Sequence, residues 1–156
     1  MKIKLLVVGK TSNTFIKSLI SDYEDRINYF INYEMIEINL KKNKNISEKE
    51  IKKKEGIKIL DRIEKKDYVV LFDENGKEYS SVEFSEFIKN KITNFSKKII
   101  FVVGGAYGFS DDIYVRSNSL ISLSKMTFSH QMIRIFILEQ LYRAFTIINN
   151  HPYHNN

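Results

Sequence analysis

The stretch "FVVGGAYGFSDD", residues 101–112, decides the fold class. It begins with the end of the apolar run "KIIFVV", residues 98–103, which predicts a strand. The run "IKLLVV", residues 3–8, is of the kind seen in buried strands of parallel sheets. After residue 103 come three glycines, and two acids follow them. The sequence then predicts a helix with Ser110 as its N-cap and with Asp111 and Asp112 in its first turn. A strand, a glycine-rich loop and a helix in this order indicate an α/β fold with a ligand site at the loop.

The glycine loop matches no phosphate-binding motif. "GGAYGF", residues 104–109, lacks both the dinucleotide pattern G-x-G-x-x-G and the Gly-Lys-Ser/Thr of a P-loop. Carboxylates in the first turn of the next helix satisfy the helix dipole and repel a phosphate. S-adenosyl-L-methionine, a sulfonium cation with an adenosine half and no phosphate, fits such a loop. The alternative is a tight turn that requires a positive φ at Gly104, Gly105 or Gly108.

Strands and helices alternate along the rest of the chain. The predicted strands are 3–8, 34–38, 68–72, 98–103 and 120–124, and the predicted helices are 13–27, 47–66, 81–92, 111–118 and 130–149. Ser12 is the predicted N-cap of the first helix, and the turn "DENGK", residues 73–77, closes the third strand. No internal repeat and no linker rich in Pro, Gly or Ser interrupts this order. We therefore predict a single α/β domain over residues 1–156, with a mostly parallel sheet.

Composition excludes several classes of protein. At 156 residues, with 43% hydrophobic and 28% charged residues, the chain has the make-up of one soluble globular domain. The absence of cysteine excludes disulfides, zinc thiolates and thiol nucleophiles. The sequence contains no cluster of metal ligands, and no run approaches the roughly 18 apolar residues of a membrane span. We therefore expect a cytoplasmic protein with neither a metal nor a membrane partner.

The net charge of +6 fits a nucleic-acid partner. The segment from Lys41 to Lys66 contains eleven Lys or Arg residues and only five acidic residues. The alternative interpretation is an AT-rich genome, which raises the Lys, Asn and Ile content, so that this segment is a solvated helix with its preceding loop. Under both interpretations, a lysine-rich helix can help to hold a phosphate backbone.

A second loop adds to the predicted ligand site. "LSKMTFSHQMIR", residues 123–134, places small, polar and apolar residues between the last strand and the last helix. Such a loop offers backbone N–H and C=O groups to an adenine edge, with Met126 and Phe128 as apolar walls.

The chain resembles a known family at this point. Five stretches of the sequence are similar to the ribosomal RNA large subunit methyltransferase H family of the SPOUT class. They are "FVVGGAYGFSDD", "LSKMTFSHQMIRIFILEQLYRAF", "HPYH", "MKIKLLVVGK" and "KKKEGIKIL". The resemblance implies a SPOUT-type α/β knot, in which the C-terminal part forms a deep trefoil knot. It also implies a homodimer that uses S-adenosyl-L-methionine to methylate N3 of a pseudouridine in 23S ribosomal RNA, on assembled ribosomes.

The resemblance also implies where the cofactor binds. By position, the cofactor residues are Phe72, with Leu71 as the alternative alignment, Gly104, Leu123, Ser124, Lys125, Met126, Thr127 and Phe128. The chain departs from the family in three places: many relatives have Leu at Phe72, relatives often have Pro at Ser129, and a basic residue often follows the last His where this chain ends in Asn-Asn.

The expected catalytic residues are His154, Tyr153 and Arg134. The first two lie in a polar tail after Pro152, where they have no obvious core role; the alternative is a merely ordered tail. Arg134 falls inside the apolar arc of the last helix. Arg134 can have a structural role, as a snorkelling or salt-bridged arginine. It can also have a functional role, in the active site or in RNA binding.

The last helix predicts a homodimer. One apolar face of this helix contains Ile133, Ile137 and Leu141, among other residues. A second apolar arc contains Leu138 and Phe145. A helix that is apolar on two sides is either wholly buried in its own domain or packed on a partner.

Two competing functions remain at this stage. A non-enzymatic basic RNA-binding protein would explain the charge but would not need the glycine loop. A different nucleotide-binding α/β enzyme is disfavoured because the phosphate motifs fail.

Overall fold

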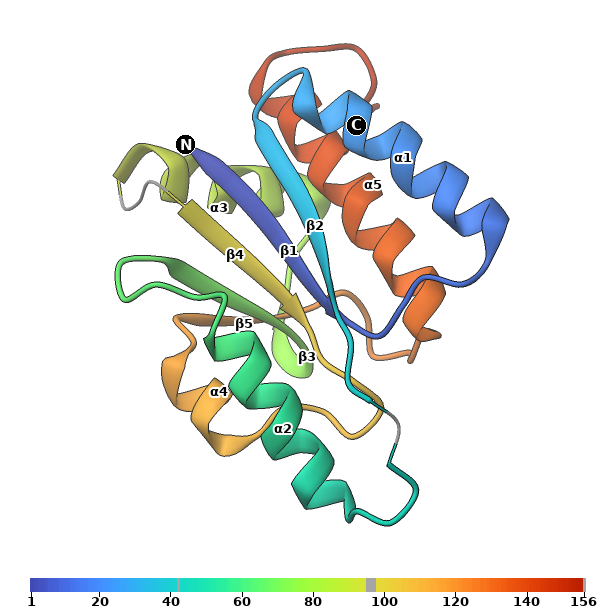
Figure 1. Ribbon diagram of the computed structural model, residues 1–156. Coiled ribbons are helices and arrows are strands. Elements are labelled where there is room, and N and C mark those ends of the chain that lie inside the picture. Colours follow the sequence, from blue (N-terminus) through green and yellow to red (C-terminus); the bar gives the residue numbers. More distant parts are fainter. Residues whose placement is uncertain (42, 95–97, 156) are drawn as a thin grey trace.

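The computed structural model of the chain describes residues 1–41, 43–94 and 98–155 (Figure 1). Strands and helices alternate in it as the sequence predicts. The elements are β1 (Lys2–Val8), α1 (Thr14–Asn28), β2 (Asn32–Ile38), α2 (Glu48–Leu60), β3 (Tyr68–Glu78), α3 (Ser81–Asn94), β4 (Lys98–Val103), α4 (Asp111–Arg116), β5 (Ser119–Ser122) and α5 (His130–Ile148).

The five strands form one sheet in the order β2-β1-β4-β3-β5, and every pairing within it is parallel. The strands β1 and β4 occupy the middle of the sheet, where "IIFVV", residues 99–103, is buried throughout. The prediction of a mostly parallel sheet is therefore confirmed. The reason is that a strand covered by helices on both faces needs apolar side chains in both directions.

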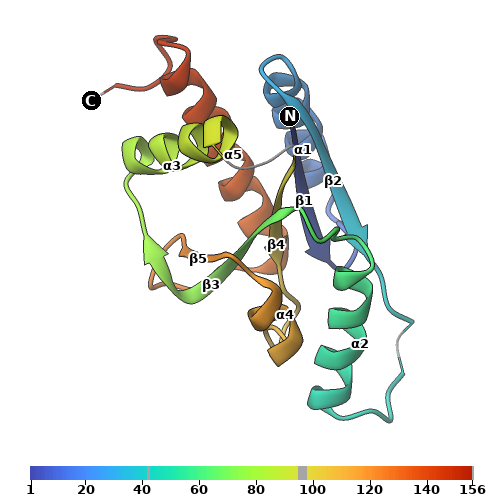
Figure 2. The same ribbon diagram turned by 90° about the vertical axis from the view of Figure 1, so that its left-hand side faces the viewer.

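Helices cover both faces of the sheet (Figures 1 and 2). On one face, α1, α3 and α5 pack against the larger core cluster, which includes Phe101 and Leu141. On the other face, α2 and α4 contribute Ile59 and Ile113 to a smaller core cluster. The result is a three-layer α/β domain. The trefoil knot implied by the resemblance stays a prediction.

The N-cap of α1 and the end of α2 differ from the sequence prediction, and the other helix ends differ by at most two residues. Ser12 is not the N-cap of α1; the Asn13 side chain accepts hydrogen bonds from the backbone N–H groups of Phe15 and Ile16, at 2.9 and 3.1 Å. The Ser12 N–H instead donates to the side chain of Gln131 at 3.1 Å. The helix α2 ends at Leu60 rather than near residue 66, and a separate turn follows it.

The predicted turn at residues 73–77 is wrong. Strand β3 continues to Glu78 with a shift in register, so that Ile121 of β5 is aligned with both Phe72 and Lys77. The intervening residues bulge out of the strand. Gly76 crosses β5 so closely that a Cβ atom on it would lie 2.5 Å from the Ile121 backbone, which explains the glycine at this position.

The second apolar arc of α5 is buried inside the protomer. Leu138 and Phe145 are 0% and 4% exposed, and both belong to the larger core cluster. The arc therefore packs on the chain's own α1 and α3 and is not evidence for a dimer. On the solvent side of α5, Phe136 is 41% exposed and Met132 is 42% exposed.

We predict unequal effects for a carboxylate placed at a buried and at an exposed leucine. Leu138→Asp puts a carboxylate into the core, and we expect the free energy of unfolding to fall by about 3–5 kcal/mol. Leu19→Asp on α1 is the control because the Leu19 side chain is 47% exposed. Urea denaturation followed by far-ultraviolet circular dichroism measures both. A Leu138→Asp protein as stable as the Leu19→Asp protein would contradict the packing of α5.

Candidate active site

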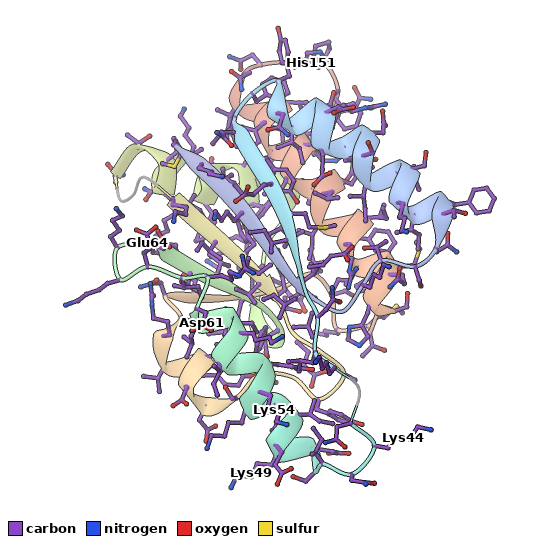
Figure 3. All side chains as sticks on the ribbon, viewed as in Figure 1. Lys44, Lys49, Lys54, Asp61, Glu64 and His151 are labelled. Carbon is purple, nitrogen blue, oxygen red and sulfur yellow. The ribbon has the colours of Figure 1, made fainter. Side chains whose placement is uncertain are left out.

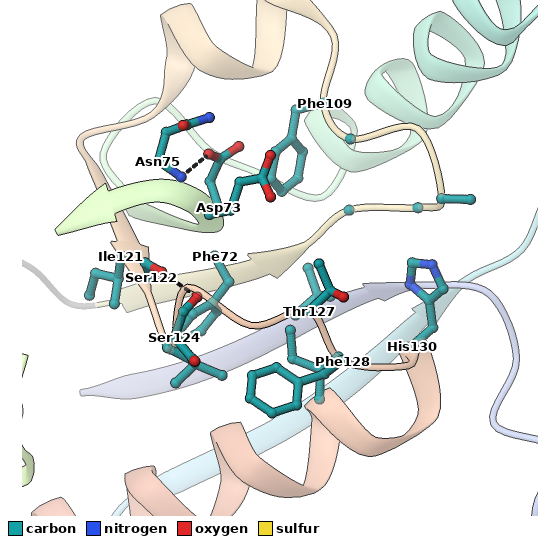
Figure 4. Close-up of a pocket in the computed structure, with 18 of the residues that line it drawn as sticks. Phe72, Asp73, Asn75, Phe109, Ile121, Ser122, Ser124, Thr127, Phe128 and His130 are labelled. Atoms are coloured by element: carbon teal, nitrogen blue, oxygen red, sulfur yellow. Dashed lines mark hydrogen bonds between the residues drawn. The ribbon is translucent and has the colours of Figure 1, made fainter. Parts of the chain in front are cut away.

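Three loops meet at the carboxyl edge of the sheet and enclose one cavity of about 490 Å³ (Figure 4). They are the bulge of β3, the glycine loop after β4 and the segment after β5, residues 122–128. The start of α5 closes the cavity with His130 and Ile133. Ligands of open α/β sheets bind in crevices outside the carboxyl ends of the strands, and this cavity is at that position.

The glycine loop needs its glycines for different reasons. The N–H of Gly108 donates to the carbonyl of Gly105 at 3.1 Å, and Gly108 has a φ of +79°, as the sequence predicts for one of the three. A Cβ atom on Gly104 would lie 3.1 Å from the ring of Phe109. A Cβ atom on Gly105 would lie 2.6 Å from the carboxylate of Glu55. The loop is thus both a tight turn and a backbone surface against which other groups pack.

The segment after β5 is held by its own side chains. The Ser122 hydroxyl donates to the carbonyl of Ser124 at 3.0 Å, and the Ser124 hydroxyl accepts from the N–H of Met126 at 3.0 Å. The apolar side chains of this segment remain accessible: Met126 is 79% exposed and Phe128 is 36% exposed. Backbone groups and apolar walls therefore face the same cavity.

The bulge of β3 brings polar residues to the cavity. The Asp73 carboxylate accepts from the N–H of Asn75 at 2.9 Å and from the hydroxyl of Tyr114 (Figure 4 shows the first of these bonds). Burial first, and then the bond to Asp73, raise the pKa of Tyr114 to about 12, so the phenol stays protonated and donates. The sequence signal for this part of the site was the polar run directly after a buried strand, which we interpreted only as a turn.

The cavity is negative, although the protein is basic. Asp73 and Glu74 line it, and none of its lining residues within the described chain is Lys or Arg. On the far side of the glycine loop, Glu55 is 7% exposed, and burial raises the pKa of its carboxyl group. Such a site attracts a cation and repels a phosphate.

The structure places seven of the nine expected cofactor residues around the cavity. They are Phe72, Gly104, Leu123, Ser124, Met126, Thr127 and Phe128. Leu71 lies outside, because neighbouring residues of a strand point to opposite faces: Phe72 belongs to the larger core cluster and Leu71 to the smaller one. The exposed Lys125 does not line the cavity either.

Arg134 does not line the cavity. It is 1% exposed, and its guanidinium donates to the Thr11 hydroxyl and to the carbonyls of Val8 and Gly9, the last two at 3.1 and 2.9 Å. Burial lowers the pKa of Arg134, partly opposed by the charge of Glu37. The hydrogen bonds of Arg134 join the start of α5 to the end of β1, and a catalytic role for this residue stays a prediction.

The tail packs on the opposite end of α5. The Tyr153 ring contacts Tyr142 at a centroid distance of 4.8 Å, and Arg143 lies 3.1 Å from Nδ1 of His154. Tyr142 is twelve residues beyond His130, which corresponds to about 18 Å along the helix axis. Tyr153 and His154 therefore lie away from the cavity of their own protomer.

A carboxylate organises the tail. The Glu139 side chain accepts hydrogen bonds from Arg143 and, at 3.3 Å, from the Tyr153 hydroxyl. The bond to Glu139 raises the pKa of Arg143, whereas burial and then the Glu139 charge raise the pKa of Tyr153. The tail is ordered by these contacts rather than by apolar packing alone.

Two further observations concern ligand classes. Within the described residues, no group of three or more His, Cys, Asp or Glu side chains is placed to hold a metal ion. None of the helices in that part of the chain is both long enough and apolar enough to cross a membrane.

Comparison with known proteins shows which class of protein the chain belongs to. Residues 1–154 match the family described as "Predicted SPOUT methyltransferase". The fold is similar to a probable methylase from Haemophilus influenzae, with a TM-score of 0.54 at 13% identity over 95% of this chain and 66% of that one. It is also similar to a TrmH/SpoU tRNA-modifying enzyme from A. aeolicus, with a TM-score of 0.52 at 10% identity over 99% of this chain and 81% of that one. The chain is a SPOUT methyltransferase.

The relatives narrow the family further. The ribosomal RNA large subunit methyltransferase H of Christiangramia forsetii is 53% identical over 156 residues, which is 99% of each chain. The protein of the same name from Flavobacterium psychrophilum is 49% identical over the same share of both chains. The chain belongs to the ribosomal RNA large subunit methyltransferase H family. It is an enzyme, and S-adenosyl-L-methionine is its cofactor.

We predict that Gly104→Val removes cofactor binding and leaves the protein folded. A Cβ atom at this position already contacts Phe109, so two further methyl groups must displace that ring or enter the cavity. Titration calorimetry with S-adenosyl-L-methionine measures the effect. Gly104→Ala, which requires a shift of only a few tenths of an ångström, is expected to lose less affinity. Wild-type affinity in the valine variant would show that the ligand does not approach this loop.

Proposed function

We propose that the protein methylates N3 of a pseudouridine in 23S ribosomal RNA, on assembled ribosomes in the cytoplasm. The name shared by the relatives supports ribosomal RNA of the large subunit as the substrate. The observation that carries the proposal is the negative cavity at the glycine loop, since it suits a sulfonium cofactor and excludes phosphate ligands. A basic protein with an acidic cavity fits an RNA substrate whose backbone stays outside that cavity.

The residues around the cavity fit S-adenosyl-L-methionine. Backbone groups of residues 122–128 would hold the adenine edge, with Met126 and Phe128 beside it, and Asp73 and Glu74 would face the cationic half. The bound cofactor supplies an activated methyl group on a sulfonium. The residues of the chain orient the two reactants, which accounts for much of the rate in an in-line displacement.

The target nitrogen needs help from the protein. N3 of pseudouridine carries an imide proton, so a base or a group that stabilises the resulting anion accelerates the reaction. We assign the removal of this proton, or the stabilisation of the anion, to His154, Tyr153 and the neighbouring Arg143. Arg143 is cationic and can stabilise an anion, and the protonated Tyr153 hydroxyl can donate to it.

This assignment requires a homodimer. The tail and the cavity lie near opposite ends of α5, so the tail of one protomer can serve only the cavity of its partner. Apolar side chains around the cavity support such a contact. The Phe128 and Phe136 rings lie 5.0 Å apart, and Met126 and Met132 are exposed nearby in the chain. We propose that this surface is the dimer interface.

The dimer is tested with the exposed position of α5. Phe136→Asp is expected to give a folded monomer in sedimentation velocity, with methyl transfer lost because each site lacks the partner's tail. Lys89→Asp, on the exposed surface of α3, is the control for an added carboxylate. A monomeric Phe136→Asp protein with full activity would exclude the shared site.

The tail is tested by removing Tyr153 to Asn156, of which Asn156 lies outside the described residues. We expect turnover to fall by about 10²–10⁴-fold, the usual contribution of positioned acid–base groups, while the affinity for S-adenosyl-L-methionine is retained. The assay is methyl incorporation at saturating cofactor. Wild-type turnover would make the tail a bystander.

The function itself is tested in cells and in vitro. Mass mapping of 23S ribosomal RNA from a strain that lacks the gene should show one pseudouridine without its methyl group. The purified protein should restore the mark on ribosomes from that strain more efficiently than on naked RNA. Preference for naked RNA would overturn the proposed substrate form, and an unchanged methylation map would overturn the proposed reaction.

A further inference from the structure

Exposed lysines without an acidic partner gather on α2 and the loop before it. Lys44, Lys49, Lys53 and Lys54 are exposed, and within the described chain none of them forms an ion pair. We call these four residues the lysine ridge. Figure 3 shows Lys44, Lys49 and Lys54 around α2, at one end of the molecule.

Four lysines elsewhere in the chain are paired with acids. Lys2 and Lys4 both contact Glu34, at 3.0 and 2.9 Å, and Lys66 and Lys98 both contact Glu64. Exposed lysines such as Lys17 and Lys89 also form no ion pair within the described residues, so the distinguishing feature of the ridge is that its four lysines are gathered on α2 and the loop before it. Unpaired surface ammonium groups carry a positive potential into solvent.

The acidic residues of α2 do not neutralise the charge of Lys53 and Lys54. Glu48 and Glu50 stand in the first turn, where they complement the helix dipole and where the Ser47 hydroxyl accepts from the Glu50 N–H. Glu55 is buried against the glycine loop. Lys53 and Lys54 consequently lie one turn beyond the acidic end of the helix, with no carboxylate paired to them among the described residues.

The ridge lies beside the cavity. A Cβ atom on Gly56 would be 2.5 Å from the Ser110 hydroxyl, so α2 packs directly on the end of the glycine loop. Glu55, next to Lys54, packs on Gly105, which lines the cavity. The helix α2 and the cavity therefore lie on opposite sides of the glycine loop.

We propose that the lysine ridge binds the phosphate backbone of the RNA that flanks the target nucleotide. This inference rests on the proposed function. The cavity is negative and repels phosphates, so cations outside it must hold the backbone. The thirteen residues of α2 extend over about 20 Å, enough to follow several phosphates. Lysine suits this task because its compact charge contacts phosphate and does not read bases.

Charge reversal tests the ridge with a matched control. Lys53→Glu/Lys54→Glu and Lys17→Glu/Lys89→Glu both change the net charge from +6 to +2, but the control pair lies on α1 and α3, on the opposite face of the sheet. For the ridge pair we expect the KM for ribosomes to rise about tenfold or more, with kcat and the affinity for S-adenosyl-L-methionine unchanged. The control pair should remain near wild type.

Salt dependence gives a second readout. Each lost phosphate contact should reduce the slope of log affinity against log salt by about 0.7–0.9. Lys53→Gln/Lys54→Gln, which removes charge without reversing it, should show this reduction with α2 intact by circular dichroism. Equal effects in the ridge and control pairs would assign the binding to net charge alone. Unchanged KM and slope in the ridge pair would overturn the inference.

Failure of the proposed function gives a different result. In that case the wild-type protein binds S-adenosyl-L-methionine but methylates no 23S ribosomal RNA. The ridge is then judged by fluorescence anisotropy with a labelled 23S fragment. Weaker binding in the ridge pair than in the control pair supports the ridge as an RNA surface, and equal binding overturns it.

Discussion

The buried guanidinium of Arg134 fixes the arrangement on which the site depends. Its bonds to the carbonyls of Val8 and Gly9 and to the Thr11 hydroxyl join the first turns of α5 to the carboxyl end of β1, an interior strand of the sheet. The last loop and His130 directly precede this point, so their placement against the glycine loop follows from it. Loss of one partner of a buried charge costs several kcal/mol, which makes this junction sensitive to substitution.

Charge is divided between the inside and the outside of the site. The cavity presents Asp73 and Glu74, whereas the neighbouring helix α2 presents lysines. A methyltransferase acting on RNA has to attract a sulfonium and a polyanion to adjacent places, and a single sign of charge cannot do both. The bulge of β3 brings Asp73 and Glu74 to the cavity, and the burial of Glu55 against Gly105 removes a carboxylate from the exposed surface of α2.

The sequence by itself determined the class of fold and two of the three loops of the cavity. The continuous apolar run of β4 can be stable only between two layers of helices, and its glycines mark the loop that follows. The small, polar and apolar residues from Leu123 to Phe128 indicate a second loop of the site, the family resemblance assigns cofactor residues to it, and the structure places most of it around the cavity. These features depend on local composition and periodicity, which can be read along one chain.

Tertiary structure alone decided the rest. The polar run 73–77 resembles an ordinary turn, and only the crossing of Gly76 over Ile121 makes it a bulge that brings Asp73 to the site. The periodicity of α5 identified its apolar arcs but not what covers them; packing on α1 and α3 buries Leu138 inside the protomer. Likewise, only the length and direction of α5 separate Tyr153 from the cavity. The physical reason is that these properties depend on contacts between residues distant in sequence, which local patterns do not specify.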